Sequence, residues 1–174
     1  MVANFLPNRD YLILFNLMKE FKSKSEIFFI IIGTGLELNR IRYYASKHKL
    51  NNFRIFEKIQ FDLLTDFYSI SNFYIHTGSE PYSTAVQFAA IAGLPIITSL
   101  NVGAAWDYIE DKKNGYLVTN KNDLDEWKMK FDKLLNLDAL KLKQMGDYSS
   151  YLARERQIRI YNQIDSIFFN LSYN

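Results

Sequence analysis

The segment SEPYSTAV, residues 79–86, combines residue types that could bind a sugar and an anion side by side. Ser83 is a candidate N-cap, so the first amides of the helix after it would point outward and favour an anion. Glu80 lies just before this helix. A carboxylate repels an anion, but the pair makes sense if Glu80 holds a polyhydroxy group while the amides hold a phosphate. The structural alternative is that Glu80 only favours the positive end of the helix dipole.

Three other positions could contribute to the same site. Gly33 and Gly35, in the loop GTGLE, would let the backbone approach a ligand, although this is not the full dinucleotide fingerprint and a tight turn is the alternative. Arg9 follows a turn and could pair with a phosphate, or it could be a solvated charge. His76 ends a strand. One histidine is not a metal site, and no Ser/His/Asp set, carboxylate cluster or metal-ligand spacing is present.

These residues follow strands in a regular alternation of strands and helices. Apolar runs predict strands at residues 3–6, 26–33, 52–57, 72–76, 95–99 and 114–119. Helical periodicity predicts helices at residues 7–24, 36–50, 61–71, 83–92, 103–110, 124–136, 138–152 and 154–171, with Asn122 and Asp123 as candidate caps of the sixth.

This alternation predicts one α/β domain over residues 1–174: a Rossmann-like, doubly wound parallel sheet flanked by helices, with two C-terminal helices. Ligands of such sheets bind outside the carboxyl ends of the strands. The candidate residues above follow those ends, so we expect them to lie at one edge of the sheet.

Composition excludes several classes of protein. The net charge is +2 and the signs alternate along the chain, which argues against nucleic acid as a partner. There is no apolar run of the ~20 residues that span a bilayer and no signal-peptide pattern. The chain has no cysteine, which fits a cytoplasmic protein.

The ordered motifs resemble the carboxyl-terminal, nucleotide-sugar-binding half of GT-B glycosyltransferases, specifically glycosyltransferase family 4. EPYSTAVQFAAIAGLP, residues 80–95, follows the family's pattern of Glu, Pro, an aromatic, a second Glu position, a small-residue helix, Gly and Pro. VANFLPNRD resembles its first strand and basic turn, FFIIIGTGLE its glycine loop, and GAAWDYIEDKKNGYLV its helix and Asn-Gly turn. The resemblance runs from about residue 2 to residue 136.

The resemblance implies a role for each matching position. Glu80 would be the catalytic-site carboxylate that holds hydroxyls of the transferred sugar. Arg9 would bind the diphosphate, and the edge formed by residues 57–59 would contact the nucleobase. The full set of implied donor-binding positions is Arg9, Gly33, Thr34, Lys58, Ile59, Pro81, Tyr82, Ser83, Thr84, Ala85 and Phe88. The family is typically retaining, needs no protein-bound metal or other cofactor, and builds polysaccharides or glycolipids from UDP- or GDP-linked sugars.

The sequence departs from the family's pattern at three positions. Phe88 stands where a second Glu would hold the ribose, Asn4 where many members carry a second basic residue, and Ser83 where glycine is usual. Losing a charge-assisted hydrogen bond costs on the order of 1.5–3 kcal/mol, which is roughly ten- to a hundredfold in donor affinity.

The family's amino-terminal acceptor domain has no counterpart here, because Met1 already lies in the first strand of the donor half. We therefore expect a donor-binding half that is inactive alone, split from a partner chain or truncated. Any association with a membrane would then be peripheral and through a partner. We also expect the apolar stripe of residues 158–169 to be partly uncovered. The alternatives are a non-catalytic binding or interaction module, which Phe88 favours, and a relic of an enzyme.

Overall fold

The computed structural model describes residues 1–6 and 10–172, and the side chains of residues up to 169. Five short strands form the centre of the domain: β1 Phe29–Ile32, β2 Phe53–Phe56, β3 Tyr74–His76, β4 Ile96–Ser99 and β5 Gly115–Val118. All of the ladders between them are parallel, with β1 paired to β2 and β4 lying between β3 and β5. Each strand falls within a predicted apolar run.

The first predicted strand is an extended segment that joins the two parts of the sheet. Val2 forms a single parallel bridge with Ile32, and the Ala3 N–H donates to the Ile32 carbonyl at 3.0 Å. On its other side, the hydroxyl of Tyr74 in β3 lies 3.2 Å from both the N and the O of Val2. A tyrosine hydroxyl replaces ladder hydrogen bonds here, so the sheet divides into a two-stranded and a three-stranded part at this junction.

Helices cover both faces of the sheet: α1 Tyr11–Glu20, α2 Leu38–Lys47, α3 Phe61–Ser69, α4 Thr84–Ile91, α5 Ala105–Tyr108 and α6 Leu124–Leu135. Consecutive strand residues point to opposite faces. Ile97 of β4 packs in the cluster beneath α1, α2 and α6, whereas its neighbour Ile96 packs in the cluster beneath α3, α4 and α5. The expected doubly wound arrangement is therefore confirmed.

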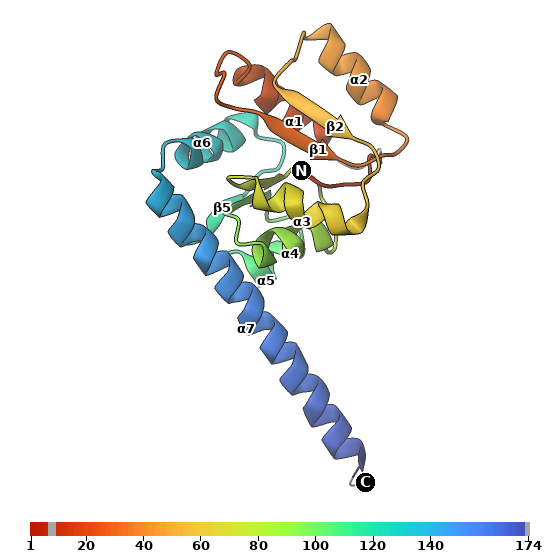
Figure 1. The fold of residues 1–174 in the computed structure, drawn as a ribbon, viewed down its shortest axis with the longest axis vertical. Coiled ribbons are helices and arrows are strands. Elements are labelled where there is room, and N and C mark those ends of the chain that lie inside the picture. The colour runs from red at the N-terminus through yellow and green to blue at the C-terminus, as the bar shows by residue number, and fades with distance from the viewer. Residues whose placement is uncertain (7–9, 173–174) are drawn as a thin grey trace.

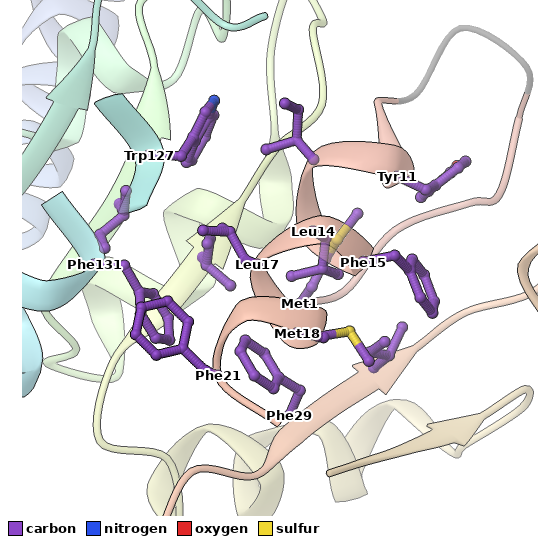
Figure 2. Packing of buried hydrophobic residues seen from close by; sticks show 14 of the residues in the cluster. Met1, Tyr11, Leu14, Phe15, Leu17, Met18, Phe21, Phe29, Trp127 and Phe131 are labelled. Carbon is purple, nitrogen blue, oxygen red and sulfur yellow. The ribbon is translucent and has the colours of Figure 1, made fainter. Parts of the chain in front are cut away.

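The larger core is rich in aromatic rings. Figure 2 shows Phe21 at the C-cap of α1, Phe29 of β1 and Phe131 of α6 converging. The ring centroid of Phe131 lies 4.8 Å from that of Phe21 and 5.6 Å from that of Phe29. Trp127 is fully buried in the same core. Asp123 caps α6 by accepting hydrogen bonds from the amides of Asp125 and Glu126, as the sequence predicts for one of its two candidate caps.

The two predicted C-terminal helices are one continuous helix, α7 Ala139–Ser172. The prediction of a break near residue 153 is wrong because no proline or glycine interrupts the chain there and the surrounding residues propagate a helix. Gly146 lies within α7 where it crosses the end of α4; a Cβ at Gly146 would be 2.1 Å from the carbonyl oxygen of Gly93. Figure 1 shows α7 passing the α/β body and continuing well beyond it.

One face of α7 is packed in its first half and uncovered in its second. Ser149 and Ala153 are 0% and 6% exposed against the body, while Ile160, Ile164 and Ile167 are 40%, 41% and 57% exposed. Steps of three and four residues keep these positions on the same side of a helix. The stripe that packs on the domain thus continues as an apolar stripe that no described residue covers. None of the described helices combines the length and the apolarity needed to cross a membrane.

Candidate functional site

A cavity of about 290 Å³ opens between the N-terminal segment and the start of α4. It lies at the junction of the two parts of the sheet, beyond the carboxyl ends of β1 and β3, where ligands of such sheets bind. Its lining residues are Val2, Ala3, Asn4, Ile32, Gly33, Glu80, Tyr82, Ser83, Thr84 and Ala85. Seven of the positions singled out in the sequence therefore meet around one space: Asn4, Gly33, Glu80, Tyr82, Ser83, Thr84 and Ala85.

The glycine loop forms one wall by packing directly on the N-terminal segment. A Cβ at Gly33 would lie 1.8 Å from the carbonyl oxygen of Ala3, and one at Gly35 would lie 2.4 Å from that of Phe5. The loop is held there by a hydrogen bond from the Phe5 N–H to the Thr34 carbonyl, 2.8 Å. The close approach of backbone to backbone explains both glycines, and Gly33 also borders the cavity. Thr34 is exposed and is not part of the lining.

The opposite wall carries Glu80, whose backbone is held on both sides. Its N–H donates to the Asn101 carbonyl at 3.2 Å, and its carbonyl accepts from the Gly103 N–H at 3.0 Å. A Cβ at Gly103 would lie 1.6 Å from the carbonyl oxygen of Pro81. The loop after β4 can therefore clamp the Glu80 backbone only because residue 103 is glycine. No local sequence pattern indicates this role of Gly103, because its contact partner lies in another loop.

The side chain of Glu80 is in contact with that of His76. Nε2 of His76 lies 2.7 Å from Oε1 of Glu80, and the two side chains are 1% and 13% exposed. Both ring nitrogens of His76 are buried, and neither makes a hydrogen bond of acceptable geometry with a described residue, so the contact with Glu80 is a close approach of the two side chains. His76 does not line the cavity. Its position at a strand end predicted only that it would lie at this edge of the sheet.

Tyr82, the aromatic residue of the motif, is tied to α4 and α5. Its hydroxyl lies 3.1 Å from that of Tyr108 and 3.2 Å from Oε1 of Gln87. Burial, and then the hydrogen bond with Tyr82, raise the pKa of Tyr108, so Tyr108 keeps its proton. Arg156 of α7 extends this network through an ion pair with Asp107 at 2.7 Å. The long helix therefore helps to fix the rim of the cavity.

The start of α4 faces the cavity with its first residues. Ser83 occupies the predicted N-cap position and is 3% exposed, but its side chain makes no capping hydrogen bond. The first amides of an α-helix have no partner within the helix. Because the Ser83 hydroxyl does not accept from them, the N–H groups of Thr84 and Ala85 can donate to a ligand oxygen, and both residues line the cavity.

Other predicted positions lie away from this cavity. Phe88 is one turn along α4, and its ring packs edge-on against that of Phe61 in α3 with the centroids 5.5 Å apart. Pro81 and Lys58 are exposed, Ile59 is half-buried, and none of the three lines the cavity. Glu57 forms an ion pair with Arg42. Arg9 lies outside the described residues.

The chain belongs to the family described as Glycosyl transferases group 1, because residues 1–151 match that family. Members of this family take a nucleotide sugar as the donor substrate. No group of three or more His, Asp or Glu side chains that could hold a metal ion occurs in the described part of the chain. A comparison with curated protein sequences finds no match.

Solved structures confirm the expected GT-B donor-domain fold. Sucrose-phosphate synthase from Thermosynechococcus elongatus superposes with a TM-score of 0.83 at 18% identity, over 99% of this chain and 45% of that one. Alr3699/HepE from Anabaena, in complex with UDP, superposes with a TM-score of 0.81 at 19% identity, over 97% of this chain and 48% of that one. The pneumococcal O-GlcNAc transferase GtfA, in complex with UDP and GlcNAc, superposes with a TM-score of 0.78 at 21% identity, over 96% of this chain and 35% of that one. The chain thus spans between about a third and a half of the length of these proteins.

Proposed function

We propose that this chain is the donor-binding half of a retaining glycosyltransferase of family 4, which moves a sugar from a UDP- or GDP-linked donor to a glycan or glycolipid acceptor. One observation carries the proposal: the Glu80 carboxylate and the start of α4 line the same cavity, which has a volume of about 290 Å³. The side chain of His76 contacts the carboxylate of Glu80. This arrangement suits a ligand with sugar hydroxyls at one end and phosphate at the other.

Each group at the cavity has a role in this proposal. Glu80 accepts hydrogen bonds from the hydroxyls of the transferred sugar, with His76 holding it in place. The amides of Ser83, Thr84 and Ala85 bind phosphate oxygens, and Arg9 adds a cation for the diphosphate. The nucleobase lies towards Gly33, Lys58 and Ile59. UDP in two of the structurally similar proteins supports a nucleotide ligand of this class.

The acceptor side of the enzyme is supplied by further polypeptide, in a longer protein or in a separate chain. Two observations support this part of the proposal. The solved neighbours are two to three times as long as the region they share with this chain, and the outer half of α7 presents an uncovered apolar stripe. The described residues alone would then bind donor without transferring its sugar.

A non-catalytic binding module is the second candidate, and the environment of Phe88 favours it. The ring at the expected ribose position packs against Phe61 and cannot accept a hydrogen bond from a ribose hydroxyl. If no other group compensates, donor affinity is roughly ten- to a hundredfold lower than with a carboxylate there.

A thermal-shift titration with UDP, GDP, ADP and their sugar conjugates tests both candidates. A ligand that binds only the folded state raises its stability by RT ln(1 + [L]/Kd). The proposal expects stabilisation of the wild type by one nucleotide and its sugar conjugate, and a weaker response to the conjugate in Glu80→Gln. Stabilisation only in Phe88→Glu, with Phe88→Gln as its uncharged control, would mean a donor pocket silenced at that position. No response from any folded variant would rule out the donor-binding function.

A further inference from the structure

A second hollow lies between the outer surfaces of α1 and α2. It is adjacent to the donor cavity, because the hydroxyl of Tyr11 in its lining donates to the carbonyl of Asn4 in the donor cavity at 2.5 Å. Its volume is about 490 Å³, within the ~300–1,000 Å³ range of small-molecule sites. It shares no lining residue with the donor cavity. Figure 1 places α1 and α2 at the end of the molecule opposite the free end of α7. We call this hollow, walled by Leu12, Phe15, Ile41, Tyr43 and Tyr44, the α1–α2 groove.

The walls of the groove suit a hydrocarbon chain better than a polar ligand. Leu12 and Tyr43 stand at its opening with 51% and 68% of their surface exposed. The rings of Phe15 and Tyr44 pack edge to face, with their centroids 5.9 Å apart. The Tyr44 hydroxyl donates to Oδ1 of Asn16 at 2.7 Å, so it is already engaged. Few free polar groups remain in these walls to recognise a nucleobase or a sugar.

The end of the groove formed by the C-termini of α1 and α2 is positively charged. Lys47 lines it beside His48. Lys19, in the last turn of α1, and Lys22 follow the groove residues Leu12 and Phe15 at steps of three and four residues, which keeps Lys19 on the same side of the helix. Partial burial, and then the charges of Lys19, Lys47 and Lys22, lower the pKa of His48 in agreement with this placement. Lysines there complement the negative ends of the two helix dipoles. None of the three forms an ion pair with another described residue.

The acidic side chains around the groove are already paired. Asp10 binds Lys121 at 2.7 Å, and Glu37 binds Arg40 at 3.0 Å. Glu20, at the end of α1, binds Lys128 at 3.3 Å. The charge left without a counter-ion is therefore the positive charge of Lys19, Lys22 and Lys47. The groove thus has apolar walls, paired charges at Asp10, Glu37 and Arg40, and unpaired positive charge at one end, and this combination complements an amphiphilic anion.

We propose that the α1–α2 groove binds an anionic lipid, with one hydrocarbon chain between the helices and a phosphate head group on Lys19, Lys22 and Lys47. This site shares no lining residue with the donor cavity and does not rest on the function proposed for that cavity. It would attach this face of the domain to a lipid molecule without any membrane-spanning helix.

Calorimetric titration of the purified chain with lauroyl lysophosphatidic acid, kept below its micelle concentration, tests the proposal. We expect saturable binding that is absent for inorganic phosphate and much weaker for the uncharged monolauroyl glycerol. Because each lysine near a lipid phosphate strengthens binding, the triple variant Lys19→Gln, Lys22→Gln and Lys47→Gln should bind at least about tenfold more weakly. Lys141→Gln, an exposed lysine on α7, is the matched control and should bind like the wild type.

Leu12→Ser separates the groove from general charge attraction, because it changes the wall and leaves every lysine in place. It should weaken binding of the lysophospholipid and of vesicles that contain phosphatidic acid. Vesicle binding that is lost in the triple variant but unchanged in Leu12→Ser would overturn the proposal, leaving only surface electrostatics. Equal binding of the charged and uncharged lipids, or binding of UDP that Leu12→Ser abolishes, would overturn it as well.

Discussion

The donor cavity and the α1–α2 groove are built from different parts of the chain. Backbone makes the first: Gly33 packs on the Ala3 carbonyl, and Gly103 packs on the Pro81 carbonyl. Side chains on two helix faces make the second. Substitutions in the backbone-built cavity must move main chain, whereas the outer wall of the groove can change with the fold intact. We therefore expect that either site can be altered without changing the other. The following variants test this expectation by their effect on the free energy of unfolding.

Gly33→Ala should have the largest effect. Its Cβ would lie 1.8 Å from the Ala3 carbonyl oxygen, so the glycine loop and the N-terminal segment must separate, at a cost of about 3 kcal/mol or more. Denaturant unfolding measures the cost, and the thermal shift with nucleotide should disappear with it. An unfolding free energy within about 1 kcal/mol of the wild type would contradict the close approach.

His76→Ala should have the next largest effect. It removes a buried ring and leaves the Glu80 carboxylate, 13% exposed, without the imidazole that lies 2.7 Å away. We expect a loss of about 2 kcal/mol and a weaker response to nucleotide sugars than to the free nucleotides, measured by thermal unfolding. His76→Gln keeps a hydrogen-bond donor and is the matched control. Equal losses in both variants would show that the ring's packing matters and its contact with Glu80 does not.

Phe88→Leu should cost less, about 0.5–1.5 kcal/mol, because it loses an aromatic pair and keeps an apolar side chain. The partner ring, Phe61, is 69% exposed. Donor binding should be unchanged, since neither ring lines the cavity. Nucleotide titration of this variant checks that point, and a marked drop in affinity would mean that the Phe88 ring itself contacts the donor.

Leu12→Ser should have the smallest effect on stability, within about 1 kcal/mol, because half of the side chain is already exposed. Denaturant unfolding measures it beside Gly33→Ala. Its response to nucleotides should equal that of the wild type. A loss of stability as large as that of Gly33→Ala would show that the groove wall is part of the core, and the contrast between the two sites would fail.

Much of the fold follows from local patterns in the sequence. The apolar runs that become β1 and β4 are buried, the periodic segments become helices, and Asp123 caps α6 as its position predicts. The division of the sheet beside Val2 was not predictable, because it depends on a hydroxyl of Tyr74 that is 72 residues away. The length of α7 was misjudged because the boundary was inferred where the residues offer no helix-breaking signal.

The sequence by itself determined which residues gather at the carboxyl edge of the sheet, since alternating strands and helices lead to parallel strands that all end there. That is why Gly33, Glu80 and Ser83 could be placed around one site before any distance was known. Only the tertiary structure decided that His76 stands behind Glu80, that Gly103 clamps it, and that Phe88 faces Phe61. It also decided that the faces of α1 and α2 enclose a groove with Lys47 at one end. These relations join residues on different elements, and their distances depend on how the elements pack, which local periodicity does not encode.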